Sequence, residues 1–197
     1  MIHAIFLDRD GTIIKEKDYL SKIVDVELLD NAVEGLKILQ DNGYVLFIIS
    51  NQSGVARGYF SENTVVEINN YLKNMLLQKG VAIEQIYYCP HHKGGSVEEY
   101  SIDCDCRKPK TGMIRKAQSQ YKIDIENSYV IGDKKSDIQL ALNCNCRAVF
   151  VLTGYGKDEQ EPILDSSVSI ANDLLEAAEI IIGQEKRHSF DAENSKS

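Results

Sequence analysis

The sequence predicts an α/β protein in which a parallel sheet lies between two layers of helices. Three observations favour this fold class. Short apolar runs recur along the chain, segments with helical periodicity separate them, and polar residues follow the runs at or soon after their ends. Regular alternation of strands and helices is typical of parallel sheets covered on both faces. Ligands bind at the carboxyl ends of the strands in such sheets, so we expect the functional residues at that edge.

Five apolar runs have the length and composition of buried strands. In chain order they cover residues 3–8, 45–51, 86–90, 128–133 and 148–154. The first segment with helical periodicity covers residues 31–41, and the glycine that stops it is Gly43. A longer helix begins after Ser61, a suitable cap, and ends before Gly80. Further helices are predicted at residues 113–121, 137–142 and 172–182.

Length and composition predict one soluble domain. A chain of 197 residues suits a single domain with a substantial core, which we expect at residues 1–183. Residues 184–197 lack an apolar period, and we expect a disordered tail there. No apolar run approaches the ~20 residues of a membrane span, and the amino-terminal residues show no export signal. We therefore expect a cytoplasmic protein with no membrane contact. The sequence does not reveal the oligomeric state, and a monomer is the default expectation.

The charge balance bears on the class of partner. The chain has 30 acidic and 22 basic residues, and this excess of negative charge repels polyanions. Extended binding of nucleic acid is therefore disfavoured, and no nucleic-acid partner is expected. A small phosphorylated substrate held by a local pair of basic residues remains compatible with the composition.

Two aspartates follow the first predicted strand. Asp8 and Asp10 lie two residues apart, so their side chains are expected to point in the same direction. Carboxylates this close repel unless a cation or a shared proton lies between them, and Mg²⁺ is a suitable cation. Asp133, after the fourth predicted strand, is a candidate third ligand. A lone pair of this spacing can equally be a capping and a solvated aspartate, so spacing alone leaves the choice open.

Three further residues could stabilise a phosphoryl group. Charge that builds up on phosphoryl oxygens during transfer has to meet donors that are already in place. Ser50 offers a hydroxyl, Asn51 a backbone N–H and Lys108 a fixed positive charge. Taken alone, Ser50 could simply cap a strand end and Lys108 could be a solvated charge.

Together, these segments resemble, in order and spacing, the four signature motifs of the haloacid dehalogenase (HAD) superfamily of phosphohydrolases. The segments are FLDRDGT, the Ser-Asn pair that ends a strand, the lysine of RKP, and GDKKSD. The resemblance covers residues 4 to about 155. It implies a Rossmann-like three-layer fold with a parallel sheet and helices on both faces.

The same resemblance implies roles for the acidic residues. Asp8 would attack phosphorus and form an aspartyl phosphate. Asp10 would protonate the leaving oxygen and then, as a base, activate water. Mg²⁺ would bind the Asp8 carboxylate, the Asp10 backbone carbonyl and Asp133, with Lys134 at the edge of that shell through its backbone. Asp137 would support Asp133 or the waters on the metal.

A loop rich in cysteine precedes the RKP lysine. Cys89-x-His91, then Cys104-x-Cys106, supplies three thiolates and an imidazole, which can close a tetrahedral zinc site. Four protein ligands leave no open position, so such a zinc ion would be structural. Disulfides are disfavoured because the total of five cysteines is odd and a reducing compartment is expected. His92 competes with His91 for the ligand position on this reasoning.

Two more cysteines lie outside that loop. Cys144 and Cys146 fall where a predicted helix gives way to a strand. Small residues pack well at such a junction, and no nearby histidine or further cysteine completes a metal site. We therefore expect them to pack in the core.

The longer motifs resemble a narrower family, the D-glycero-D-manno-heptose 1,7-bisphosphate 7-phosphatases. They are FLDRDGT, SNQSGVARGYF, CPHHKGGSVEEYSIDCDCRKPKTGM and GDKKSD. Members act in nucleotide-activated heptose synthesis and carry a zinc loop, here residues 89–106, instead of a large cap domain. The resemblance selects His91 as the zinc ligand, assigns recognition of the sugar bisphosphate to Arg107 and stabilisation of the phosphoryl group to Lys108. It also implies substrate contacts from Glu16, Tyr19, Ser50, Asn51, Gln52 and Ser53.

Three alternatives remain at this stage. Histidinol-phosphate phosphatases share the superfamily motifs and a comparable zinc loop, but SNQSGVARG favours the heptose family. A nucleic-acid 3′-phosphatase could use the same aspartates, yet it would need a basic groove that an acidic chain does not indicate. A zinc-stabilised binding module without catalysis is disfavoured, because every expected catalytic residue is present.

Overall fold

The computed structural model describes residues 1–159 and 168–194. Within these residues, six strands form one sheet in the order β3-β2-β1-β4-β5-β6. The strands are β1 (Ala4–Leu7), β2 (Val45–Asn51), β3 (Ile83–Cys89), β4 (Tyr129–Gly132), β5 (Arg147–Val151) and β6 (Ser169–Ala171). All neighbouring strands are parallel. The predicted α/β class with a parallel sheet is therefore confirmed.

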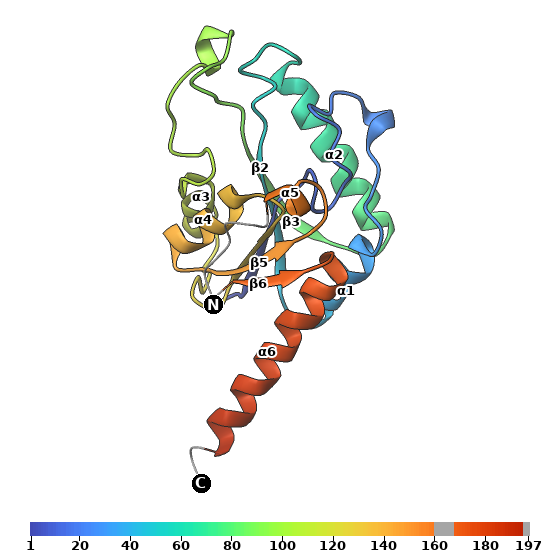
Figure 1. The fold of residues 1–197 in the computed structure, drawn as a ribbon, viewed down its shortest axis with the longest axis vertical. Coiled ribbons are helices and arrows are strands. Elements are labelled where there is room, and N and C mark those ends of the chain that lie inside the picture. The colour runs from blue at the N-terminus through green and yellow to red at the C-terminus, as the bar shows by residue number, and fades with distance from the viewer. Residues whose placement is uncertain (160–167, 195–197) are drawn as a thin grey trace.

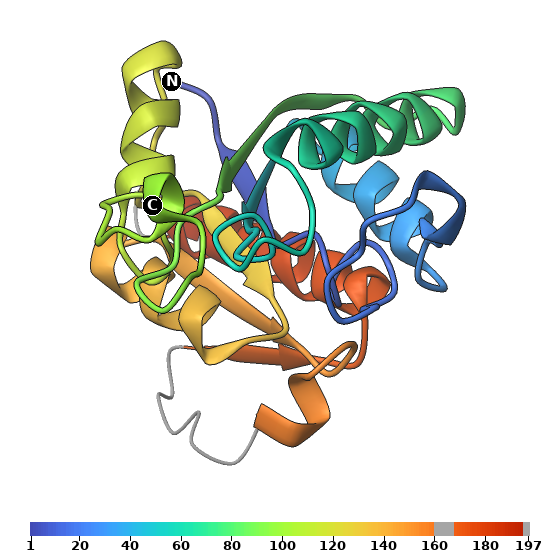
Figure 2. The same cartoon turned by 90° about the horizontal axis from the view of Figure 1, so that it is seen from above.

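Helices cover both faces of this sheet. In the described residues the α-helices are α1 (Ala32–Asp41), α2 (Glu62–Gln78), α3 (Gly112–Gln120), α4 (Lys135–Cys144), α5 (Gly156–Glu159) and α6 (Leu174–Asn194). Helices α1, α2 and α6 pack on one face, and α3 and α4 pack on the other, as the view from above shows (Figure 2). No helix in the described ranges is both long and apolar enough to cross a membrane.

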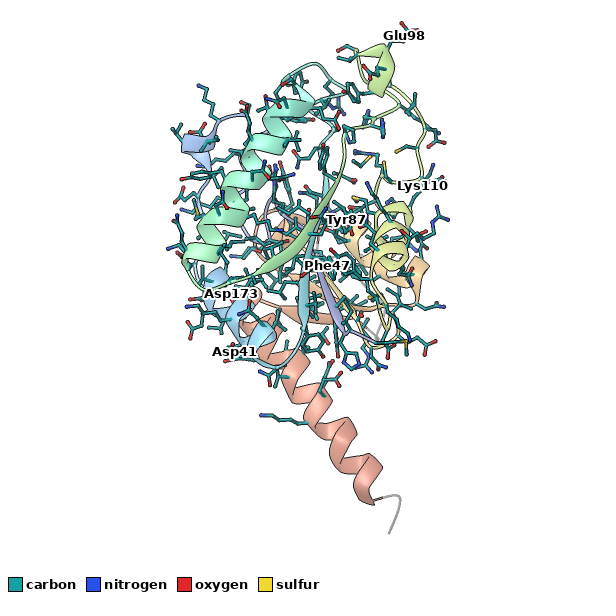
Figure 3. The ribbon with its side chains drawn as sticks, turned by 180° about the vertical axis from the view of Figure 1, so that it is seen from behind. Asp41, Phe47, Tyr87, Glu98, Lys110 and Asp173 are labelled. Carbon is teal, nitrogen blue, oxygen red and sulfur yellow. The ribbon has the colours of Figure 1, made fainter. Side chains whose placement is uncertain are left out.

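Side chains that alternate along the strands fill two apolar layers. On β1, Ile5 and Leu7 join the layer under α1, α2 and α6, whereas Phe6 joins the layer under α3 and α4. All three are fully buried, as expected for a strand covered on both faces. In the second layer the rings of Phe47 on β2 and Tyr87 on β3 stack with centroids 6.4 Å apart (Figure 3).

The segment between β3 and α3 is the insertion in which a cap domain was not expected. Residues 90–111 are all described, and among them the only regular element is the 3-10 helix Glu98–Tyr100. This loop lies at the end of the molecule opposite to the one from which α6 projects (Figure 1). The insertion is therefore a loop rather than a cap domain.

Two short elements escaped the sequence analysis. Strand β6 has three residues and helix α5 has four, which is too short for either period to show. The five predicted strands and the five longer helices are all present.

The carboxyl-terminal residues, where a disordered tail is expected, are described as far as Asn194. Helix α6 continues to Asn194, so the residues from 184 to 194 are helical and the boundary expected at residue 183 falls inside this helix. Glu185 helps to anchor it, because its Oε1 accepts hydrogen bonds from Arg147 Nη1 at 2.7 Å and from the Tyr129 hydroxyl at 3.2 Å. Residues 195–197 of the expected tail lie outside the described residues.

Candidate active site

Two aspartates meet at the point where the order of strands changes direction. Asp8 follows β1 and Asp133 follows β4, and these neighbouring strands pair Leu7 with Ile131. The Asp8 N–H donates to the Ile131 carbonyl at 2.9 Å, so the two strand ends stay in register. Crevices at such switch points are the usual ligand sites of parallel sheets. Both carboxylates are buried there.

A glycine lets the first loop pass close to Asp133. Gly11 has a φ of +87°, and a Cβ at this position would lie 2.1 Å from Asp133 Oδ2. Neither the backbone angle nor the space allows a side chain here. The Asp133 carboxylate is also held by the Tyr155 N–H, which donates to Oδ2 at 2.9 Å, and by the Thr12 hydroxyl, 3.5 Å from Oδ1.

Lys108 brings a buried positive charge to these carboxylates. Its Nζ lies 2.8 Å from Asp8 Oδ1 and 2.7 Å from Asp137 Oδ1, and it donates to the Ile49 carbonyl at 2.9 Å. Asn51 fixes the lysine backbone, because its Oδ1 accepts from the Lys108 N–H at 3.0 Å and its Nδ2 donates to the Lys108 carbonyl at 3.1 Å. The side chain of Asn51 thus has a positioning role that the sequence did not indicate.

The charges around Asp8 keep it ionised. Burial opposes ionisation, but attraction to the ammonium groups of Lys108 and Lys134 outweighs burial and lowers the pKa of Asp8. Burial and repulsion from Asp8 raise the pKa of Asp133 to about 8. Burial, partly offset by Lys108, raises the pKa of Asp137 to about 6. Of the three carboxylates, Asp8 is the one whose pKa is lowered, so it is held as the anion that a nucleophile requires.

The oxygen atoms of this site form a cation-binding set. Carboxylate oxygens of Asp8, Asp133 and Asp137 lie within 4.8 Å of one another. The Lys134 ammonium lies among them, with Nζ 3.8 Å from Asp8 Oδ2, 3.8 Å from Asp133 Oδ1 and 3.4 Å from the Asp10 carbonyl. Hard oxygen ligands of this kind suit Mg²⁺. Asp137 also accepts the Lys134 N–H at 3.2 Å, in keeping with a supporting role.

The Asp10 carboxylate is held by polar groups at the end of β2. Gln52 Nε2 donates to Asp10 Oδ2 at 2.8 Å and to the Ser50 hydroxyl oxygen at 2.7 Å. The Ser50 hydroxyl lies 3.5 Å from the same Asp10 oxygen. The first and second strands thus bring their polar ends into one network.

Residues 16–19 form one wall of the site. The Glu16 carboxylate binds Lys134 Nζ at 3.1 Å and accepts the N–H groups of Lys17 and Asp18 at 3.0 Å each. Asp18 and Tyr19 both have a positive φ, of 43° and 71°, which is uncommon for residues with side chains. This wall is therefore shaped by a short strained loop that Glu16 ties to the aspartates.

These groups line a cavity of about 290 Å³. Its lining contains most of the residues that the sequence selected: Asp8, Asp10, Glu16, Tyr19, Asn51, Gln52, Ser53, Arg107, Lys108 and Lys134. Two selected residues, Ser50 and Asp133, are buried and lie outside the lining. The lining also contains Arg9, Asp18, Leu20, Gly54, Ser136 and Tyr155, which the sequence analysis did not select. Arg9, Gly54 and Ser136 stand inside the motifs FLDRDGT, SNQSGVARGYF and GDKKSD, so their sequence positions were a signal for the site.

The four candidate zinc ligands come together beside this cavity. Cys104 Sγ lies 3.5 Å from Cys89 Sγ and 3.3 Å from Cys106 Sγ, and His91 Nδ1 lies 3.3 Å from Cys106 Sγ and 3.8 Å from Cys89 Sγ. Zinc bond lengths of about 2.3 Å to sulfur and about 2.0–2.1 Å to nitrogen give tetrahedron edges of roughly 3.6–3.8 Å. Hydrogen bonds from Cys89 and His91 lower the pKa of Cys106 to about 5. The geometry of these four ligand atoms fits zinc.

His92, Arg107, Cys144 and Cys146 are not members of this four-residue cluster. The His92 ring contacts Arg57, with Nη2 of the arginine 3.2 Å from His92 Nε2. Arg107 Nη1 donates to the His91 carbonyl at 3.2 Å, which joins the zinc loop to the cavity wall. Cys146 Sγ donates to the Ser128 carbonyl at 3.0 Å, and burial raises the pKa of Cys144 to about 11.

Comparisons with known proteins agree with this geometry. A family model described as HAD-hydrolase-like matches residues 105–177. The D-glycero-alpha-D-manno-heptose-1,7-bisphosphate 7-phosphatase of Photorhabdus laumondii is 43% identical over 89% of this chain and 97% of its own. The corresponding beta-anomer phosphatase of Haemophilus influenzae is 39% identical over 86% of this chain and 95% of its own.

A solved structure extends the agreement to the fold. The D,D-heptose 1,7-bisphosphate phosphatase of B. bronchiseptica, complexed with magnesium and phosphate, superposes with a TM-score of 0.82 at 28% identity. The alignment covers 93% of this chain and 99% of that one. The sheet order and the aspartate–lysine site define a hydrolase of the HAD class. Within that class, the chain belongs to the D-glycero-D-manno-heptose-1,7-bisphosphate 7-phosphatase family.

Proposed function

We propose that the chain is a Mg²⁺-dependent phosphatase that removes the 7-phosphate of D-glycero-D-manno-heptose 1,7-bisphosphate. The observation that carries this proposal is the buried Asp8 carboxylate, kept ionised by Lys108 at 2.8 Å and facing a cavity of about 290 Å³. An ionised carboxylate beside a fixed cation is suited to attack on a phosphate ester.

The reaction would proceed in two steps. An Asp8 oxygen attacks phosphorus, the bond from phosphorus to the sugar O7 breaks, and Asp10 gives its proton to the departing oxygen. Water then attacks the phosphoryl group on Asp8, Asp10 takes a proton from that water, and inorganic phosphate leaves. The Ser50 hydroxyl, the Asn51 N–H and Lys108 would bind the phosphoryl oxygens in both steps.

Two metal ions with different tasks are part of the proposal. The Asp8 and Asp133 carboxylates and the Asp10 carbonyl would hold Mg²⁺, with the Lys134 backbone at the edge of the site. When bound, Mg²⁺ neutralises negative charge on the phosphoryl oxygens. Zinc would be structural, held by the cluster Cys89, His91, Cys104 and Cys106.

Two arginines support a substrate with a second phosphate. Among the described residues, no carboxylate forms an ion pair with Arg57 or Arg107. Burial and the positive charges of Arg107 and Arg57 lower the pKa of His92. Arg107 lines the cavity, and Arg57 lies over the ring of Tyr19, which also lines it. Arginines without a carboxylate partner in such places suit a phosphate that is bound and not hydrolysed. Histidinol phosphate, with one phosphate, would leave them unused.

A substrate panel tests the proposal. Purified protein with Mg²⁺ is given both anomers of the heptose bisphosphate, histidinol phosphate, fructose bisphosphate and a 3′-phosphorylated oligonucleotide, and phosphate release is measured. We expect the highest kcat/KM with a heptose bisphosphate, release of one phosphate per molecule, and no turnover by Asp8→Asn. Preference for histidinol phosphate, or an active Asp8→Asn variant, would contradict the proposal. Light scattering and cell fractionation test the further proposals that the protein is a monomer and is cytoplasmic.

A further inference from the structure

Arg9 stands between the two catalytic aspartates and is almost completely buried, with 1% of its surface exposed. Its Nε donates to Asp10 Oδ2 at 3.1 Å and its Nη2 donates to Asp10 Oδ1 at 3.0 Å. A guanidinium group that binds both oxygens fixes the direction of a carboxylate as well as its position.

The third side of this guanidinium is held by a residue far away in the sequence. Asn69, in the middle of α2, accepts a hydrogen bond from Arg9 Nη1 through Oδ1 at 2.8 Å. Asn69 is itself buried, between Ile68 and Leu72 on the face that packs against the sheet. Asparagine has a low helix propensity, and a buried amide needs a partner. The hydrogen bond with Arg9 therefore explains why an asparagine stands on this apolar face of the helix.

We propose that Asn69 and Arg9 act as positioning residues for the acid–base carboxylate. Asn69 fixes the Arg9 guanidinium, and Arg9 orients Asp10 for proton exchange first with the leaving oxygen and then with water. This inference rests on the proposed function of Asp10. Asn69 lies outside the residues that line the cavity, so its effect has to pass through Arg9.

The two halves of the reaction depend differently on Asp10. Attack on p-nitrophenyl phosphate expels a weakly basic phenolate, which needs no proton from Asp10. Hydrolysis of the aspartyl phosphate still needs Asp10 as a base. A misoriented Asp10 should therefore slow the second half-reaction with this substrate and leave the first intact.

The test compares Asn69→Leu with Asn70→Leu, a matched change at the next, exposed position of the same helix. Rapid mixing with p-nitrophenyl phosphate and Mg²⁺ follows p-nitrophenolate release. For Asn69→Leu we expect a burst of about one equivalent per folded chain, then a steady state slower on the order of 10- to 100-fold, with KM lowered in parallel and kcat/KM unchanged because the first half-reaction is intact. Asn70→Leu should match the unmodified protein. Steady-state turnover of Asn69→Leu equal to that of Asn70→Leu would overturn the proposal.

A second variant separates positioning from a loss of folding. Asn69→Asp retains an oxygen acceptor for Arg9, so turnover should recover to within a few-fold of the unmodified protein. If Asn69→Asp is as slow as Asn69→Leu while thermal unfolding shows both to be folded, the proposal is wrong. A burst of p-nitrophenolate from Asp8→Asn would instead refute the assignment of Asp8 as the nucleophile, and with it the proposed function. That outcome is independent of the result for the Asn69 variants.

Discussion

The Lys108 ammonium lies 2.8 Å from Asp8 Oδ1. The same Nζ lies 2.7 Å from Asp137 Oδ1, so one buried cation joins the end of β1 to the first turn of α4. When Asp8 carries a phosphoryl group, its own negative charge is lost but that of the phosphoryl oxygens is added. Lys108 therefore has an anionic partner throughout the proposed cycle, and Asp137 keeps it in place.

Removing this cation should slow turnover strongly. For Lys108→Met we expect kcat to fall on the order of 100- to 1,000-fold, the cost of losing one fixed donor to the transition state. Two buried carboxylates also lose their partner, so the free energy of unfolding should fall by about 3–5 kcal/mol. Lys110→Met is the matched control, because Lys110 is exposed and pairs with Asp103 at the surface. Equal kcat values for the two variants, measured by phosphate release, would contradict the role of Lys108.

Gly11→Ala should damage the site by a clash rather than by backbone strain alone. A Cβ at Gly11 would lie 2.1 Å from Asp133 Oδ2, whereas Gly43, with the same φ of +87°, has nothing within 4 Å. Both changes carry the cost of a positive φ, which is of order 1 kcal/mol. Only Gly11→Ala should weaken Mg²⁺ binding, measured by titration calorimetry. Unaltered Mg²⁺ affinity in Gly11→Ala would show that the Asp133 carboxylate can move aside without loss.

The sequence predicted those parts of the site that depend on strand ends. Asp8, Ser50 and Asp133 each follow a clear apolar run, and parallel strands bring their carboxyl ends to one edge. The contact between Arg9 and Asn69 was not predictable in this way. Asn69 falls within a regular helical period, and nothing in that period shows which side chain it meets 60 residues away.

Other features were missed because they depend on side-chain conformation. Lys134 was expected to take part through its backbone, yet its ammonium reaches Glu16 at 3.1 Å and the Asp10 carbonyl at 3.4 Å. The pairing of Asn51 with Lys108 likewise depends on how the loop before α3 returns to β2. A sequence pattern gives residue type and spacing, whereas these contacts depend on rotamers set by the folded core.

Loss of the zinc cluster should impair the bisphosphate reaction more than simple ester hydrolysis. Cys104→Ser removes a ligand, and the chain around His91 then no longer holds Arg107, whose Nη1 donates to the His91 carbonyl at 3.2 Å. We expect about one zinc per chain by elemental analysis in the unmodified protein and much less in Cys104→Ser. The kcat/KM for heptose bisphosphate should fall more than that for p-nitrophenyl phosphate. Cys144→Ser, outside the cluster, should keep both zinc and activity. Full zinc content in Cys104→Ser would refute the ligand set.

Magnesium binding should strengthen as pH rises, because Asp133 has to lose a proton. Burial and repulsion from Asp8 raise the pKa of Asp133 to about 8. Below that pH the protonated form dominates and Mg²⁺ must displace the proton, so affinity should rise by up to about tenfold per pH unit between pH 6 and 8. Above pH 8 the carboxylate is already ionised and the dependence should level off. Titration calorimetry at pH 6.5, 7.5 and 8.5, in two buffers with different heats of ionisation, measures both the affinity and the protons released. We expect close to one proton per Mg²⁺ at pH 6.5 and fewer at pH 8.5, whereas equal affinities without proton release would show that Asp133 is ionised before the metal binds.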